Sequence, residues 1–166
     1  MPGHFVTAEE LERLMAEQQI TPGIFIFPDS PTAEARLTGH CQTMELPPPV
    51  RWHAGLLHWT VRDLAQTGGE IPPPPEPALI PAQARLAGLH GTVIALCAQS
   101  ADSLKAIMKH YKEDGGPWPV FCMITPQSLD MSLSLLFEHL GEDRLRENHR
   151  RRLLEQRRRA AESEGA

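Results

Sequence analysis

Short apolar runs alternate with stripes of apolar residues at helical spacing, and this alternation predicts an α/β protein. Three runs are nearly continuous in apolar residues, at 24–27, 92–98 and 119–124. Runs of this length with β-branched and aromatic members are typical of strands buried on both faces. A helical stripe follows each of the last two runs, so we expect crossovers that join neighbouring parallel strands. The predicted sheet is small and mostly parallel, with three to four strands and flanking helices.

Residues that favour helix starts mark where three of these helices begin. The capping box Thr7-Ala8-Glu9-Glu10 predicts a helix to about Gln18. Ser100 is a suitable N-cap for the helix after the second run, and Thr125 followed by Pro126 suits the helix after the third. That last helix carries a clean apolar stripe, formed by Leu129, Leu133, Leu136, Phe137 and Leu140. This order of elements is that of one half of a Rossmann-like fold.

The pattern between residues 29 and 66 is weaker. Asp29-Ser30-Pro31 is typical of a turn, and the alternation from Gln42 to Leu46 suits a short strand. Apolar residues at helical spacing favour a helix from Arg51 to Gln66, and a strand over 57–61 is the alternative.

A proline-rich stretch at 68–83 divides the chain into two halves. Four successive prolines, Pro72 to Pro75, have a fixed φ and no amide donor, so we expect polyproline II here. The stretch is either a linker between two domains or a connection that wraps the surface of one domain. We favour a single domain over 1–141, because the N-terminal half contains one convincing strand and too little core to fold alone.

Basic residues are concentrated at the C-terminus, where residues 144–166 hold eight of the sixteen basic side chains and four acidic ones. The other 143 residues carry eight bases and seventeen acids. Two arginine triplets, 150–152 and 157–159, lie one heptad apart and therefore stack on one another in a helix. We expect a protruding basic helix over 142–166. The candidate partner-binding residues are its arginines: Arg144, Arg146, Arg150, Arg151, Arg152, Arg157, Arg158 and Arg159.

An acidic body with a basic helix is suited to contact an acidic surface, on another protein or on a second copy of the chain. Nucleic acid is a further possibility, because guanidinium groups suit phosphate. The tail has no lysine and no aromatic residue, and the sequence pI of about 5.9 is low for a dedicated nucleic-acid binder. A solvated helix without a specific partner is the remaining interpretation. We favour a non-catalytic regulatory or assembly module that contacts an acidic macromolecule.

The alternative function is that of a small α/β hydrolase for acyl transfer, with its site near Ser100 and Thr125, where two strands end. Nucleophile turns and phosphate-binding turns use glycine at this place, whereas the turn here reads Cys97-Ala98-Gln99-Ser100-Ala101-Asp102. Asp102 also places a negative charge where a phosphate would bind. Helix capping is therefore the favoured role of Ser100, and we assign no catalytic residue.

The stretch Ile94–Leu140 resembles the methylesterase domain of chemotaxis response regulators in its order of strand, helix, strand and proline-started helix. The resemblance implies parallel strands joined by a helical crossover. The glycine-rich serine turn of that family is replaced by 98–101, and its histidine would fall on Ile124 or Thr125. The resemblance therefore extends to topology and not to activity.

No metal and no cofactor are expected, because no His-x-x-x-His or Cys-x-x-Cys spacing occurs. Cys97 and Cys122 lie inside apolar runs and should be buried and inert, whereas Cys41 has polar neighbours. Trp118, held between two prolines, is a candidate to line a pocket at the start of the third run.

Two observations bear on location. The chain has no run of eighteen apolar residues and no basic segment followed by an apolar one near its start, so neither membrane insertion nor secretion is expected. Three cysteines, an odd number, fit a reducing compartment. We expect a cytoplasmic protein that makes no membrane contact.

Overall fold

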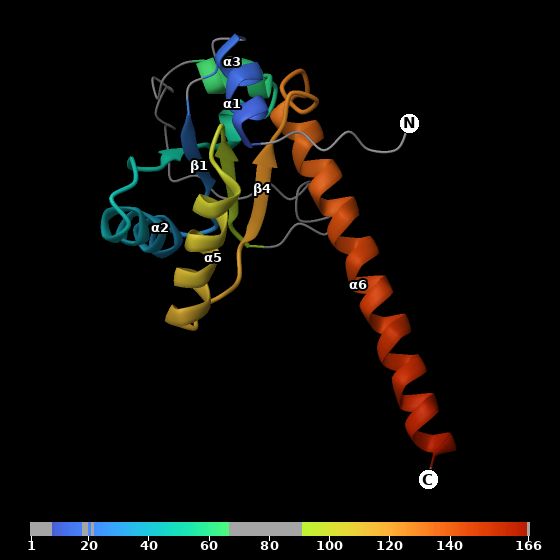
Figure 1. Ribbon diagram of the computed structural model, residues 1–166. Coiled ribbons are helices and arrows are strands. Elements are labelled where there is room, and N and C mark those ends of the chain that lie inside the picture. The colour runs from blue at the N-terminus through green and yellow to red at the C-terminus, as the bar shows by residue number, and fades with distance from the viewer. Residues whose placement is uncertain (1–7, 18–19, 21, 67–90, 166) are drawn as a thin grey trace.

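The computed structural model describes residues 8–17, 20, 22–66 and 91–165. A four-stranded sheet with the order β2-β1-β3-β4 lies between two layers of helices (Figure 1). Its strands are β1 (Gly23–Phe27), β2 (Val50–Arg51), β3 (Val93–Cys97) and β4 (Val120–Ile124). The predicted α/β class, with four strands, flanking helices and a long C-terminal helix, is confirmed.

The sheet is mixed, so the expectation of a mostly parallel sheet is wrong at its centre. β3 and β4 are parallel, as the helical crossover between them requires. β2 is parallel to β1, but β1 runs antiparallel to β3, with Gly23 opposite Cys97 and Phe27 opposite Val93. A strand that is buried on both faces has the same apolar pattern in either direction. The sequence therefore predicted that β1 is interior and not which way it runs.

Helices cover both faces of the sheet, which produces two cores. One face is covered by α2 (Pro31–Thr43) and α5 (Ala101–Asp114). Its buried side chains are Ile24, Ile26, Leu37, Cys41, Ile94, Leu96, Ile107 and Tyr111. The other face is covered by α1 (Ala8–Glu17), α3 (Val61–Gln66) and the first turns of α6 (Leu133–Glu164). Buried side chains on that face include Met15, Phe25, Phe27, Leu64, Val93, Leu133 and Phe137.

Residues 42–46 do not form the predicted strand, because α2 extends to Thr43. The helix is stabilised at its start, where Ser30 Oγ accepts a hydrogen bond from the Ala33 amide at 3.2 Å and Pro31 occupies the first turn. The alternation in this stretch comes from the partly exposed last turn, which leads into a turn where Glu45 has a φ of 56°.

The predicted helix over 51–66 is wrong in its first part. β2 takes its first residue, a single 3-10 turn η1 (Ala54–Leu56) follows, and only α3 is helical as expected. Trp52 is buried and stacks on Phe25 with 4.8 Å between ring centroids. Pairing of residues 50–51 with β1 therefore decides the structure of this segment, although its apolar residues are at helical spacing. The alternative strand over 57–61 is wrong too, since turns and the start of α3 occupy those residues.

The helix start predicted at Thr125 is also wrong. Residues 126–130 form turns, and α6 begins at Leu133 with Ser132 as its N-cap. The Thr125 amide donates a hydrogen bond to Ser128 Oγ at 2.9 Å, so Ser128 stabilises the turn that precedes the helix. The capping residue Thr7 and the proline-rich stretch 68–83 lie outside the described residues.

Candidate functional site

The helix α6 begins on the body of the protein. Leu133, Leu136 and Phe137 are buried, and Phe137 packs edge-on against Phe27 with 4.8 Å between ring centroids. From residue 148 to residue 165 every side chain is exposed. Figure 1 shows this second part of the helix projecting past the end of the sheet. We call residues 148–165 the free half of α6.

The free half is helical although it covers no core. The anchored turns supply the helix nucleus, so each further residue adds a backbone hydrogen bond at a low entropic cost. Four ion pairs at a spacing of four residues support the helix: Arg146–Glu142, Arg151–Glu147, Arg158–Glu162 and Arg159–Glu155. The basic tail predicted from residue 142 is therefore the second part of one continuous helix of 32 residues.

All eight arginines predicted to bind a partner lie on α6, but their surroundings differ. Arg150 Nη2 donates to Glu147 Oε1 at 3.0 Å, and this hydrogen bond lowers the pKa of the Glu147 carboxyl. Arg159 Nη2 likewise donates to Glu155 Oε1 at 2.9 Å. Arg152 and Arg157 have no acidic partner in the part of the chain that the structure describes. These two guanidinium groups are free to contact another molecule.

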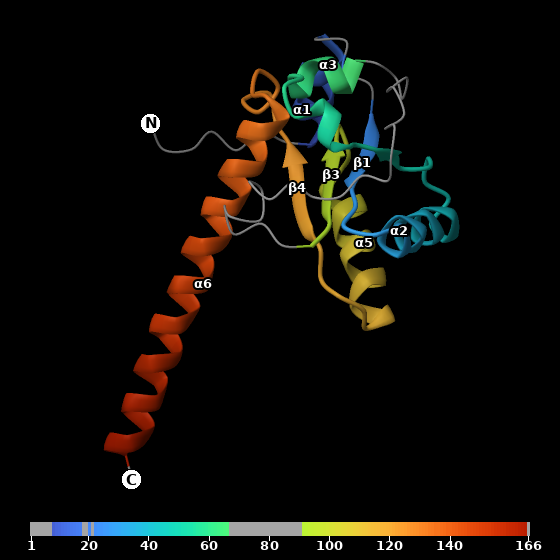
Figure 2. The same cartoon turned by 180° about the vertical axis from the view of Figure 1, so that it is seen from behind.

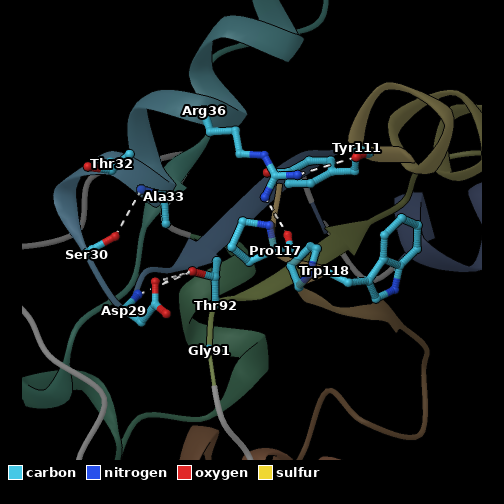
Figure 3. A pocket seen from close by; sticks show the side chains of 11 residues that line it. Asp29, Ser30, Thr32, Ala33, Arg36, Gly91, Thr92, Tyr111, Pro117 and Trp118 are labelled. Atoms are coloured by element: carbon cyan, nitrogen blue, oxygen red, sulfur yellow. Dashed lines mark hydrogen bonds between the residues drawn. The ribbon is translucent and has the colours of Figure 1, made fainter. Parts of the chain in front are cut away.

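A pocket of about 170 Å³ lies where β1 ends and where β3 and β4 begin (Figure 3). The first turns of α2 form one wall, and the loop 115–119 between α5 and β4 forms another. Trp118 lines it with half of its side chain exposed, which confirms the prediction from the sequence. At the rim, the Thr92 hydroxyl donates to Asp29 Oδ1 at 2.8 Å and accepts from the Asp29 amide.

Arg36 is held between a carboxylate and an aromatic ring at this pocket. Its Nε and Nη2 donate to Asp114 at 2.6 and 2.5 Å, and its guanidinium carbon lies 4.1 Å from the centre of the Tyr111 ring. The hydrogen bond with Arg36 lowers the pKa of Asp114, which also binds His40 Nε2 at 2.7 Å. Because Arg36 is already neutralised, it is unsuited to hold an incoming anion. Its Nη1 donates to the Pro117 carbonyl, so the cluster fixes the loop that carries Trp118.

The edge suggested for a hydrolase, at the carboxyl ends of β3 and β4, is occupied by capping turns. Ser100 Oγ accepts a hydrogen bond from the Ser103 amide at 3.1 Å, so Ser100 is the N-cap of α5. Thr125 Oγ1 lies 3.4 Å from Ser128 Oγ. No histidine is a hydrogen-bond partner of Ser100 or Thr125 within the described ranges. The geometry supports helix capping, and no described residue is placed as a base for either hydroxyl.

Ala98 has a φ of 53°, in the left-handed region that favours glycine. It follows β3 directly, so an alanine supplies the turn where nucleophile and phosphate loops carry glycine. An L-residue in this region costs roughly 1–2 kcal/mol, while glycine costs about 0.5–1 kcal/mol in unfolded-state entropy. We expect Ala98→Gly to raise the free energy of unfolding by up to about 1 kcal/mol in urea denaturation. The matched control, Ala95→Gly in the buried interior of β3, should lower it instead, and stabilisation by both changes would contradict this explanation.

The three cysteines are free thiols and all are buried. Burial raises the pKa of Cys97 to about 12 and that of Cys122 to about 11, and it also raises the pKa of Cys41. Cys41 lies in the core between α2 and the sheet, so its expected polar surroundings were a wrong inference from sequence neighbours. On a helix, chain neighbours point in other directions.

The buried thiols should react slowly in the native protein. Thiolate is the reactive form, and each unit of pKa lowers its fraction about tenfold at neutral pH. We therefore expect a disulfide reagent to label Cys97 and Cys122 of the folded chain about a hundredfold more slowly than in urea, or slower still, and to label Cys41 more slowly as well. Rapid labelling of one equivalent under native conditions would show that Cys41, Cys97 or Cys122 is accessible.

Among the described residues, no group of three or more histidine, cysteine, aspartate or glutamate side chains is arranged to hold a metal ion. None of the described helices is both long enough and apolar enough to cross a membrane.

Comparison with known protein families gives a match to part of the chain. A family described as a domain of unknown function (DUF3783) matches residues 92–146. The matched segment contains β3, α5, β4 and the anchored turns of α6, and it ends before the free half. No curated protein matches the chain, and no solved structure matches it.

Proposed function

We propose that the protein is a non-catalytic regulatory or assembly module, in which an α/β body presents the free half of α6 to an acidic macromolecular partner. The observation that carries the proposal is the exposure of every residue from 148 to 165 in a segment with six arginines and three glutamates. Three free cysteines, all buried, fit a reducing cytoplasm as the compartment.

The charge distribution supports this role. The chain up to residue 143 has nine more acidic than basic side chains, so it repels acidic molecules and leaves the free half as the place for them to approach. Cationic patches of this kind raise association rates and make binding sensitive to salt. Because the arginines are solvated, their charges act on binding and contribute little to the stability of the fold.

Charge reversal tests the proposal. The full chain and a variant with Arg150, Arg151, Arg152, Arg157, Arg158 and Arg159 changed to glutamate would be used to capture partners from native lysate, with and without nuclease. We expect the variant to lose the partner while its melting temperature stays nearly unchanged, and a variant with the same six residues changed to lysine should retain much of the capture.

Two outcomes would count against the proposal, and a third would identify the acidic partner as nucleic acid and not protein. Equal capture by the glutamate variant would remove α6 from the contact. A large fall in its melting temperature would indicate that the helix packs on its own chain or on a second copy. Loss of the captured material on nuclease treatment would identify nucleic acid as the partner, and its log affinity should then fall linearly with log salt, by roughly 0.9 per phosphate contacted on B-form DNA.

A further inference from the structure

A narrow seam runs along the free half of α6. His149, Leu153, Gln156 and Ala160 follow one another at spacings of four, three and four residues, which keeps them on one side of a helix. Leu153 is 41 % exposed although it is apolar. At about 100° per residue, Leu153 lies about 160° around the helix from Phe137, which packs on the sheet. The seam therefore faces away from the body, and Figure 2 shows that the free half also stands clear of the body from behind.

Arginines flank the seam on both sides. In heptad terms the seam occupies positions d, a, d and a, and the adjoining e and g positions are Arg150, Arg152, Arg157 and Arg159. Arg152 and Arg157 point about 140° apart, one on each side of the seam. These are the two arginines of the free half that lack an acidic partner in the described part of the chain.

Two of the three carboxylates of the free half lie away from the seam. Glu155 and Glu162, which pair with Arg159 and Arg158, point about 130–150° away from its centre. Glu164 is at an e position, seven residues beyond Arg157, and it is the last residue of the helix. Along the edges of the seam, Arg150 and Arg159 are paired with Glu147 and Glu155, so the positive charge without an acidic partner among the described residues is that of Arg152 and Arg157.

We propose that the seam pairs with an amphipathic helix of another protein, whose own apolar seam is flanked by glutamate or aspartate. Such a helix would cover Leu153 and place carboxylates opposite Arg152 and Arg157, as charged e and g positions do in coiled coils. This inference rests on the proposed function and specifies the partner as an acidic helix.

Pairing with a second copy of α6 is disfavoured by the same residues. In a parallel or an antiparallel pair of identical helices, arginines at e and g would face arginines, and like charges at these positions select against self-association. Histidine and glutamine in the seam also reduce its apolar area, so charge contributes much of the selectivity.

The test uses synthetic peptides of 21 residues and the full chain. The first peptide has leucine or isoleucine at a and d and glutamate at e and g. The second has the same composition with its glutamates moved to b, c and f, and the third has lysine at e and g. We expect fluorescence anisotropy at low salt to show at least tenfold tighter binding of the first peptide than of either control.

Matched variants locate the contact on the helix. Arg152→Glu with Arg157→Glu should weaken binding of the first peptide at least tenfold. Arg151→Glu with Arg158→Glu makes the same change in charge on the side away from the seam and should weaken it less than threefold. Circular dichroism would verify that both variants retain the helix content of the wild type.

Equal binding of the first two peptides would contradict pairing through the seam, because net charge alone would then explain the affinity. Equal weakening of binding by the two double variants would contradict it as well. Absence of binding to the first peptide would also overturn it. In each of these cases, capture from lysate that still depends on the six arginines would leave the proposed function standing. Sedimentation could instead show that the chain forms a dimer and that changing Arg152 and Arg157 to glutamate abolishes it. The partner of the seam would then be a second copy of the chain and not an acidic helix of another protein.

Discussion

Phe137→Ala is expected to lower the free energy of unfolding by about 3–5 kcal/mol. The ring is 2 % exposed and packs edge-on against Phe27, so it joins the start of α6 to the face of the sheet. Its removal leaves a cavity and loses the aromatic contact at the point where the long helix is anchored. Urea denaturation followed by circular dichroism measures the change.

The free half provides the control for this prediction. Deleting residues 149–166 removes no buried side chain among the described residues 149–165 and should leave the free energy of unfolding of the body nearly unchanged. A large loss of stability on this deletion, or a loss below 1 kcal/mol for Phe137→Ala, would contradict the division of α6 into an anchored and a free half.

Leu96→Ala is expected to lower the free energy of unfolding by about 2–5 kcal/mol. Leu96 is fully buried on β3, pairs with Ile24 of β1 and Met123 of β4, and belongs to the core under α2 and α5. The surrounding strands are fixed by their hydrogen bonds, so the cavity cannot collapse fully. Leu145→Ala on α6, where the side chain is 53 % exposed, is the matched control and should change stability by less than about 0.5 kcal/mol. Similar losses for both leucines would show that β3 is less buried than described.

The elements predicted well are those in which a local pattern coincides with burial. β1, β3 and β4 are short apolar runs, and α5 has a capping serine at its start and Gly115 in the left-handed conformation at its end. No local pattern in the sequence indicated the direction in which β1 runs. β2 was missed because two residues leave no periodicity, and its position is set by pairing with β1.

The candidate sites divide in the same way. The sequence was enough to select the eight arginines of α6 as a candidate site, because they are close together in the chain. The cluster of Arg36 and Asp114 was not, since 78 residues separate its two partners and neither has a distinctive neighbour. The seam of α6 required the structure as well, because the sequence did not show that the helix with the apolar stripe of Phe137 continues without a break to Glu164. Sequence patterns predict what lies along an element, and the tertiary contacts decide which side is left free.

Hydrogen exchange of α6, in the free chain and in its captured complex, tests most directly that the free half is the contact surface. In the free chain, amides of 148–165 should exchange much faster than those of β3, because no tertiary contact protects them. In the complex, the same amides should slow while β3 stays unchanged. Protection equal to that of β3 in the free chain, or no change of 148–165 on binding, would contradict the account.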